Sequence, residues 1–130
     1  MLIELRIRDY AVLDDVSLQL KPGLNVLSGE TGAGKSIIVG ALSLLVGERA
    51  SSQVVRKGAP RATVEAAFDI AKIPDFQDRL VELGFPQEED LVILKREVAA
   101  EGRNRAWVNG SPATAAAVGD LGTRLIDIHG

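Results

Sequence analysis

The chain contains no cysteine, which excludes disulfide bridges and thiolate metal sites and is compatible with a reducing compartment. Its one histidine, His129, has only Asp127 near it at ligand spacing, and this argues against a metal site. No apolar run reaches the roughly 18 residues that a membrane span needs. Charged residues interrupt the N-terminal apolar residues, so a signal peptide is not expected either. We therefore expect a cytoplasmic protein without a membrane segment.

Neither sign of charge dominates the sequence. The formal net charge is -3, from 15 basic and 18 acidic residues, so the chain is not basic throughout. A local basic patch remains open, because contact with nucleic acid depends on how cations cluster and not on their sum. With 130 residues, of which 46% are hydrophobic, the chain can bury a core. No repeat or interdomain linker is visible, so we expect residues 1–130 to form one unit.

One eight-residue motif is the most informative feature of the sequence. It fits G-x-x-x-x-G-K-[ST], the phosphate-binding loop of nucleoside triphosphatases, and consists of Gly29, Glu30, Thr31, Gly32, Ala33, Gly34, Lys35 and Ser36. An apolar, β-compatible run at 24–28 precedes it. The run at 37–46 is apolar, free of proline and long enough for about three helical turns. The motif therefore has the strand before it and the helix after it that such a loop requires.

Each residue type in the motif meets a chemical demand of a bound nucleotide. The glycines let backbone N–H groups curl around phosphate oxygens, where a Cβ would obstruct their approach. Lys35 supplies a mobile cation for the β- and γ-phosphates, and Ser36 offers its hydroxyl to Mg²⁺. The positive end of the helix dipole points at the same anion. The motif predicts a site for ATP with Mg²⁺.

The remaining sequence patterns predict an α/β fold with a mixed sheet around the phosphate-loop helix and an antiparallel β subdomain. The helix after the loop should end near Gly47, a short helix should run from Pro74 to Gly84, and Ser111 with Pro112 should open a third. Asn109-Gly110 predicts a tight turn. Strands are expected at residues 2–7, 16–20, 24–28, 54–55, 63–70, 91–98, 105–108 and 125–128.

With the loop in place, the whole chain resembles the RecN family of bacterial DNA repair proteins, relatives of the SMC and Rad50 ATPases within the ABC superfamily. The Glu30-Thr31-Gly32-Ala33 filling of the loop is similar to RecN, whereas SMC proteins tend to carry Asn-Gly-Ser-Gly there. The other segments that carry the resemblance are residues 2–7, 22–27, 44–49, 103–110 and 125–130.

The resemblance implies an ATPase head that is built from both ends of a longer chain, with an antiparallel coiled coil between them. Residues 1–130 correspond to the first lobe only. The signature loop, the Walker B carboxylates, the D-loop and the switch histidine belong to the C-terminal lobe, and a glutamine that contacts Mg²⁺ would follow Gly130. In the family, Gly29 to Ser36 and Ile37 bind ATP, and two heads close around it in response to DNA. The implied role is in double-strand-break repair and recombination at the nucleoid.

Several cations outside the loop are candidates for contact with DNA phosphates. Arg49, Arg56 and Lys57 follow the loop helix in an otherwise acidic chain, and the resemblance suggests that Arg49 couples DNA or the partner head to the nucleotide. Arg56, Lys57 and Arg61 form either a DNA-facing edge or a solvated hairpin, and we favour the hairpin. Arg103 and Arg105 are further candidates.

Two aromatic residues have both a structural and a functional interpretation. Trp107 lies among basic residues, as in stacking platforms for single-stranded DNA, but a lone aromatic in a strand favours core packing. Tyr10, with Ala11 and Val12, occupies a segment that passes near the base in related heads. We expect it to pack under the edge of the sheet.

Three other functions share the phosphate loop. An ATPase subunit of a transporter would need a membrane partner, and the strand that begins at Leu2 and the Glu30-Thr31 filling of the loop speak against it. A small kinase would need an acceptor site with acid and base groups, and none is visible in the sequence. A non-catalytic nucleotide-binding module is the third alternative.

Overall fold

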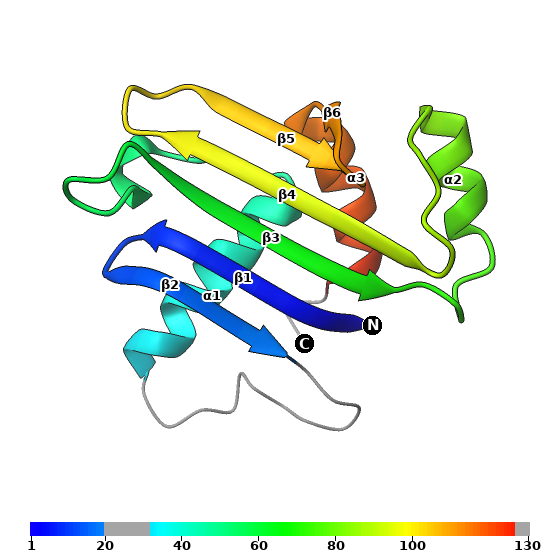
Figure 1. The fold of residues 1–130 in the computed structure, drawn as a ribbon, viewed down its shortest axis with the longest axis horizontal. Helices are drawn as coiled ribbons and strands as arrows, with labels where there is room; N and C mark the ends of the chain where they lie inside the picture. The colour runs from blue at the N-terminus through cyan, green and yellow to red at the C-terminus, as the bar shows by residue number, and fades with distance from the viewer. Residues whose placement is uncertain (20–31, 127–130) are drawn as a thin grey trace.

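The computed structural model describes residues 1–19 and 32–126, which form one sheet with helices on a single face (Figure 1). The sheet has the strand order β2-β1-β3-β4-β5-β6, and every neighbouring pair is antiparallel. The elements are β1 (Leu2–Tyr10), β2 (Leu13–Gln19), α1 (Gly32–Leu45), the 3₁₀ turn η2 (Ser52–Val54), β3 (Arg61–Asp69), α2 (Phe76–Leu83), β4 (Leu91–Ala99), β5 (Asn104–Val108), β6 (Ser111–Ala113) and α3 (Ala115–Leu125).

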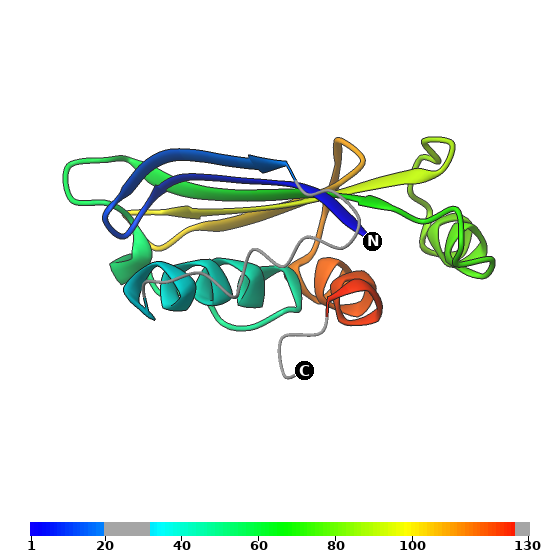
Figure 2. The ribbon, with the colours of Figure 1, turned by 90° about the horizontal axis from the view of Figure 1, so that it is seen from below.

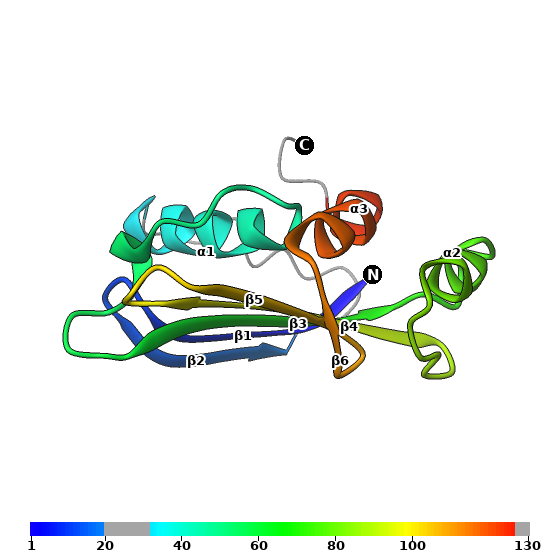
Figure 3. The same ribbon diagram turned by 90° about the horizontal axis from the view of Figure 1, so that it is seen from above.

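Alternation along the strands decides which face of the sheet is buried. In β3 and β4 every second side chain is fully buried, and these side chains point toward α1 and α3. Figures 2 and 3 show both helices under one face, with the other face left uncovered by any described element. The core therefore lies between the sheet and α1 with α3, and the largest wholly buried side chains are Phe68, Phe76, Leu5, Ile7, Leu45, Leu80, Leu94 and Leu121.

Helices α1 and α3 touch through glycine. A Cβ added to Gly122 would lie 1.7 Å from the carbonyl oxygen of Leu45, and one added to Gly119 would lie 2.7 Å from the Cα of Gly47. Gly47 has a φ of 89°, a left-handed conformation that L side chains rarely adopt. Only glycine allows this approach, and the contact fixes where α1 ends.

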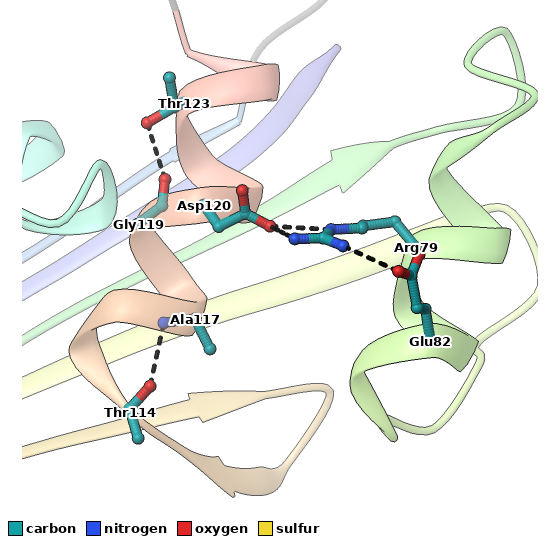
Figure 4. A network of polar contacts seen from close by, with 7 residues as sticks. All are labelled: Arg79, Glu82, Thr114, Ala117, Gly119, Asp120 and Thr123. Carbon is teal, nitrogen blue, oxygen red and sulfur yellow. Dashed lines mark hydrogen bonds and ion pairs between the residues drawn. The ribbon is translucent and has the colours of Figure 1, made fainter.

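Helix α2 is attached at the far end of β3 and β4. Its Phe76 and Leu80 are buried, and Gly84, with a φ of 83°, ends it with an amide that donates to the carbonyl oxygen of Leu80. Arg79 of α2 donates to Asp120 of α3 through Nε at 2.9 Å, and its Nη1 lies 3.3 Å from Glu82 (Figure 4). These contacts tie α2 to the helix layer.

Most of the predicted elements are confirmed. The strands predicted at 2–7, 16–20, 63–70, 91–98 and 105–108 are present within three residues of their expected ends, although residue 20 lies outside the described part. The loop helix and the helix after Pro74 end where Gly47 and Gly84 predict. Asn109 and Gly110, both with positive φ, make the turn between β5 and β6. The antiparallel part of the predicted fold is confirmed.

Two predictions of secondary structure are wrong. Val54 ends the turn η2, and Val55 makes only an isolated bridge to Tyr10, so residues 54–55 form no strand. Ser111 and Pro112 do not open a helix but form the edge strand β6, where the missing proline N–H costs no ladder bond. Thr114 caps α3 instead, and its hydroxyl accepts from the amide of Ala117 (Figure 4).

The two remaining predicted strands, at residues 125–128 and 24–28, lie partly or wholly outside the described residues. Leu125 ends α3, so the strand expected at 125–128 does not begin there. Ile126 is extended, and residues 127–130 lie outside the described part. The strand expected at 24–28 lies outside it too, and with it the mixed part of the predicted sheet. Across residues 1–19 and 32–126, no helix is long and apolar enough to cross a membrane.

Candidate nucleotide-binding site

The predicted phosphate loop leads directly into α1. Gly32, Ala33, Gly34 and Lys35 form its first turn, while Gly29, Glu30 and Thr31 lie outside the described residues. The first turn of α1 contains no acidic residue, so no carboxylate competes there with an anionic ligand for the positive end of the helix. The Ser36 side chain is exposed, and its assignment to Mg²⁺ stays a prediction. This part of the chain fits a triphosphate with Mg²⁺.

The two ends of α1 differ in how they are packed. Toward the C-terminal end Ala41, Leu42, Leu44 and Leu45 are buried, whereas residues 37–40 are only half-buried although three of them are apolar. A helix that is apolar all round is usually covered on all sides. Among the described residues, the sheet, α3, the turn at Tyr10 and the segment that follows α1 lie against it (Figures 2 and 3). The N-terminal half of α1 therefore presents an apolar flank that a further layer of protein would cover.

The turn between β1 and β2 lies beside α1. Tyr10 is 7% exposed, and a Cβ added to Gly40 would lie 3.0 Å from its hydroxyl oxygen. Asp9 and Ala11 on either side adopt positive φ values of 50° and 54°. Burial raises the pKa of the Tyr10 phenol. The predicted packing of Tyr10 is confirmed, and it leaves Val12 exposed at the tip of the turn.

The segment after α1 returns along the helix to this turn (Figure 3). The amide of Ala11 donates to the carbonyl oxygen of Val54 at 2.6 Å, and that of Arg56 donates to Asp9 at 2.8 Å. Arg49 lies at the start of this segment, two residues after the contact of Gly47 with α3, and Arg56 lies at its other end. The fold therefore does not bring Arg49 together with Arg56 and Lys57.

The other candidate cations are exposed and mostly paired with carboxylates. Arg56 lies 3.4 Å from Asp14, Arg61 lies 3.7 Å from Glu97, and Arg103 lies 3.8 Å from Glu101. Such exposed pairs are weak and screened by salt, so they do not prevent contact with another anion. The assignment of Arg49, Arg56 and Lys57 to DNA contact stays a prediction.

Trp107 does not pack in the core, so the preferred interpretation of this residue was wrong. It points to the uncovered face of the sheet, because its neighbours Ala106 and Val108 take the buried positions of β5. It is half-buried, and Lys95 Nζ lies 5.0 Å from the centre of its ring. Trp107 lines a shallow depression there with Glu65, Ile93, Lys95 and Gly110.

One residue that matters for α1 was missed by the sequence interpretation. Arg96 of β4 is 2% exposed and points into the core, where it is the only buried charged side chain among the described residues. It donates from Nη1 to the carbonyl oxygen of Leu44 at 2.8 Å and from Nη2 to Asn104 Oδ1 at 3.1 Å. Burial lowers the pKa of its guanidinium. A signal was present, because Arg96 interrupts the inward apolar series of Val92, Leu94 and Val98.

Comparison with known proteins identifies the family. The model of a family described as an AAA domain matches residues 4–103, which is most of the chain. The chain belongs to this AAA domain family. Its phosphate loop and α1, the features that define the site, fall inside the matched range.

Individual relatives agree with this assignment. The chain is 46% identical over its whole length to the DNA repair protein RecN of Xylella fastidiosa strain Temecula1 and 38% identical to that of Bacillus subtilis. It spans 23% of each of these relatives. A solved structure concerned with ATP-driven dimerization and DNA-stimulated activation of SMC ATPases superposes with a TM-score of 0.70 at 27% identity, covering 94% of this chain and 77% of its own. The predicted resemblance and the head-lobe fold are thus confirmed.

Proposed function

We propose that this chain is the N-terminal, ATP-binding lobe of a RecN-type, SMC-like ATPase head that acts in DNA double-strand-break repair and recombination. The observation that carries the proposal is α1: it starts within the phosphate-loop motif, has no acid in its first turn, and is held at its other end by the sheet and by α3. The identity to RecN relatives supports the biological role.

The residues of the loop have separate tasks in this proposal. Backbone amides between Gly29 and Gly34 hold the phosphates of ATP, Lys35 neutralises the β- and γ-phosphates, and the hydroxyl of Ser36 holds Mg²⁺. When bound, Mg²⁺ neutralises charge on the terminal phosphates. Ile37, in the second turn of α1, completes the ATP-contacting set.

The rest of the active site comes from outside residues 1–130. Phosphoryl transfer depends on positioning and on charge stabilisation, and the groups that orient water and stabilise the leaving phosphates belong to a C-terminal lobe and to the signature loop of a second head. The half-buried apolar flank of α1 at residues 37–39 supports the presence of such a lobe. ATP binding would then close two heads, and DNA would promote closure. The protein would act in the cytoplasm, at the nucleoid.

Calorimetry of ATP with Mg²⁺ on the full-length protein and its Lys35→Ala variant tests the proposal. Loss of charge-assisted contacts costs about 1.5–3 kcal/mol, so affinity should fall by one to two decades and can drop below detection. Lys72→Ala, which removes an exposed lysine far from α1 in sequence, is the matched control and should bind as wild type does. Equal affinity in wild type and Lys35→Ala would remove the phosphate-loop assignment.

Turnover by the 130-residue chain tests the division of the site. Alone it should bind nucleotide weakly and hydrolyse none. Adding the C-terminal lobe should restore hydrolysis, at a rate that rises faster than linearly with protein concentration because two heads form one active unit. Steady hydrolysis by residues 1–130 alone, abolished by Lys35→Ala, would contradict the divided site and favour the kinase alternative.

A further inference from the structure

Arg96 is buried without a carboxylate partner among the described residues. The other arginines that form ion pairs there have side chains 28% to 65% exposed. Arg96 is 2% exposed, makes only its two hydrogen bonds to neutral oxygens, and leaves Nε buried with no partner. Burying a charge without a counter-ion is costly, and an apolar residue of similar volume is often as stable in such a place. Stability alone therefore does not explain an arginine at this position.

The hydrogen bonds of Arg96 explain the presence of an arginine here better than stability does. The carbonyl oxygen of Leu44 is in the last turn of α1, where carbonyls lack a partner within the helix and carry the negative end of its dipole. The alternative donor, the amide of Gly47, is more distant at 3.4 Å. Arg96 thus connects the negative end of α1 to strand β4 through a short, charge-assisted bond of 2.8 Å.

Arg96 is held in turn from the hairpin between β4 and β5. Asn104 accepts from Arg96 Nη2 and donates from its own Nδ2 to the carbonyl oxygen of Gly102 at 3.3 Å. Asn104 therefore orients the guanidinium and joins it to the exposed turn that carries Arg103. A chain of polar contacts runs from this turn through Arg96 to the end of α1.

Because α1 is a rigid rod, anchoring its C-terminal end through Arg96 also sets the direction of its N-terminal end, where the phosphate loop lies. The helix has 14 residues and is about 21 Å long. Its C-terminal end is held between Arg96 on one side and the glycines of α3 on the other, while residues 37–40, nearer the loop, are only half-buried. Releasing this end would let the first turn, which carries Lys35 and Ser36, change its direction relative to the sheet.

We propose that Arg96 is a positioning residue for the nucleotide: it anchors the C-terminal end of α1 to the sheet so that the phosphate loop at the other end keeps its binding geometry, and Asn104 orients it. The inference rests on the proposed function, since it concerns the same nucleotide site. It predicts that Arg96 affects nucleotide affinity more than it affects stability.

The test compares Arg96→Met, Arg96→Lys and Asn104→Ala with wild type in the full-length protein. Calorimetry with ATP and Mg²⁺ measures affinity, and urea unfolding measures stability. Arg96→Met should keep or raise the unfolding midpoint yet weaken binding by about ten- to a hundredfold, the scale of one lost charge-assisted contact to the phosphates. Arg96→Lys keeps the charge but cannot bridge both acceptors, so its affinity for ATP should lie between those of wild type and Arg96→Met. Asn104→Ala should show a smaller loss of affinity.

Arg79→Met is the control, because Arg79 also joins two elements through its guanidinium but is 28% exposed, pairs with carboxylates, and connects α2 to α3 rather than holding α1. It should lower stability and leave affinity unchanged. Arg96→Met that folds and binds within twofold of wild type overturns the inference. If that variant does not fold, wild-type affinity in both Arg96→Lys and Asn104→Ala overturns it instead. Failure of wild type itself to bind ATP would instead refute the proposed function.

Discussion

Replacing Gly122 by alanine tests the close contact between α1 and α3. Gly-to-Ala changes within a helix normally stabilise by about 1 kcal/mol, because alanine has the better helix propensity. Here the new methyl would lie 1.7 Å from the carbonyl oxygen of Leu45, far inside the 3.0 Å that real Cβ atoms keep from such atoms. The obstacle is backbone, so the two helices have to separate by more than an ångström.

The size of the effect follows from these two opposing terms. Overpacking of a core costs about 1–3 kcal/mol, and a clash with backbone falls at or above the upper end of this range. After the gain in helix propensity, we expect Gly122→Ala to be less stable than wild type by about 2 kcal/mol. Urea unfolding of the 130-residue chain, followed by circular dichroism and by the fluorescence of its single tryptophan, measures this difference.

Gly40→Ala provides a matched control within α1. Its methyl would lie 3.0 Å from the Tyr10 hydroxyl oxygen, at the far end of a side chain that can shift. The gain in propensity should then offset the contact, and the stability should stay within about 1 kcal/mol of wild type. A Gly122→Ala protein that is as stable as wild type, or more stable, would show that the helices do not approach as closely as described.

Three further predictions concern charge. Ser36→Ala should weaken binding of ATP with Mg²⁺ but leave metal-free ATP affinity nearly intact, and equal losses in calorimetry with and without the metal would contradict the role of Ser36. Neutralising Arg49, Arg56 and Lys57 in the full-length protein should reduce the slope of log K for DNA against log salt by roughly two to three units. Because Arg49 is separate from the other two, neutralising Arg49 alone should reduce the slope by about one unit. An unchanged slope in fluorescence titrations would mean that these cations are merely solvated. Arg6 and Arg8 hold the pKa of Asp15 below its ordinary value, so this carboxylate contributes to stability at neutral pH and the contribution is lost as pH falls through its folded pKa. Arg6→Gln should raise the pKa of Asp15 in an NMR titration. An unchanged pKa would exclude the ion pair.

Local patterns were sufficient to predict most elements of the fold. The alternation in β1, β3 and β4 reports a sheet with one buried face, and that face is where α1 lies. Gly47 and Gly84 mark helix ends because their positive φ values suit residues without a side chain. The phosphate loop could be assigned because its spacing matches the needs of a phosphate group.

The misses concern features that depend on tertiary neighbours. Pro112 favours a helix start by local rules, yet an edge strand tolerates it because no strand of residues 1–19 and 32–126 lies on its other side. Trp107 has a large apolar side chain of the kind that usually packs in a core, but only the placement of α1 and α3 decides which face of β5 is covered. Gly119 and Gly122 contact residues 45–47, at the end of α1 and just after it, and Arg96 bonds the carbonyl oxygen of Leu44. These contacts join residues more than 50 positions apart, so no local pattern could identify them.

The strand order has a consequence for how the protein folds. All neighbouring strands are consecutive in sequence except β1 and β3, which are separated by β2, the phosphate loop and α1. The β1–β2 hairpin and the β3–β6 part can each form from nearby contacts, whereas joining them requires the closure of the long segment that contains the loop, and this closure costs entropy. We therefore expect the loop to be completed late in folding, once this segment has closed. Bound nucleotide should therefore slow unfolding far more than it speeds refolding.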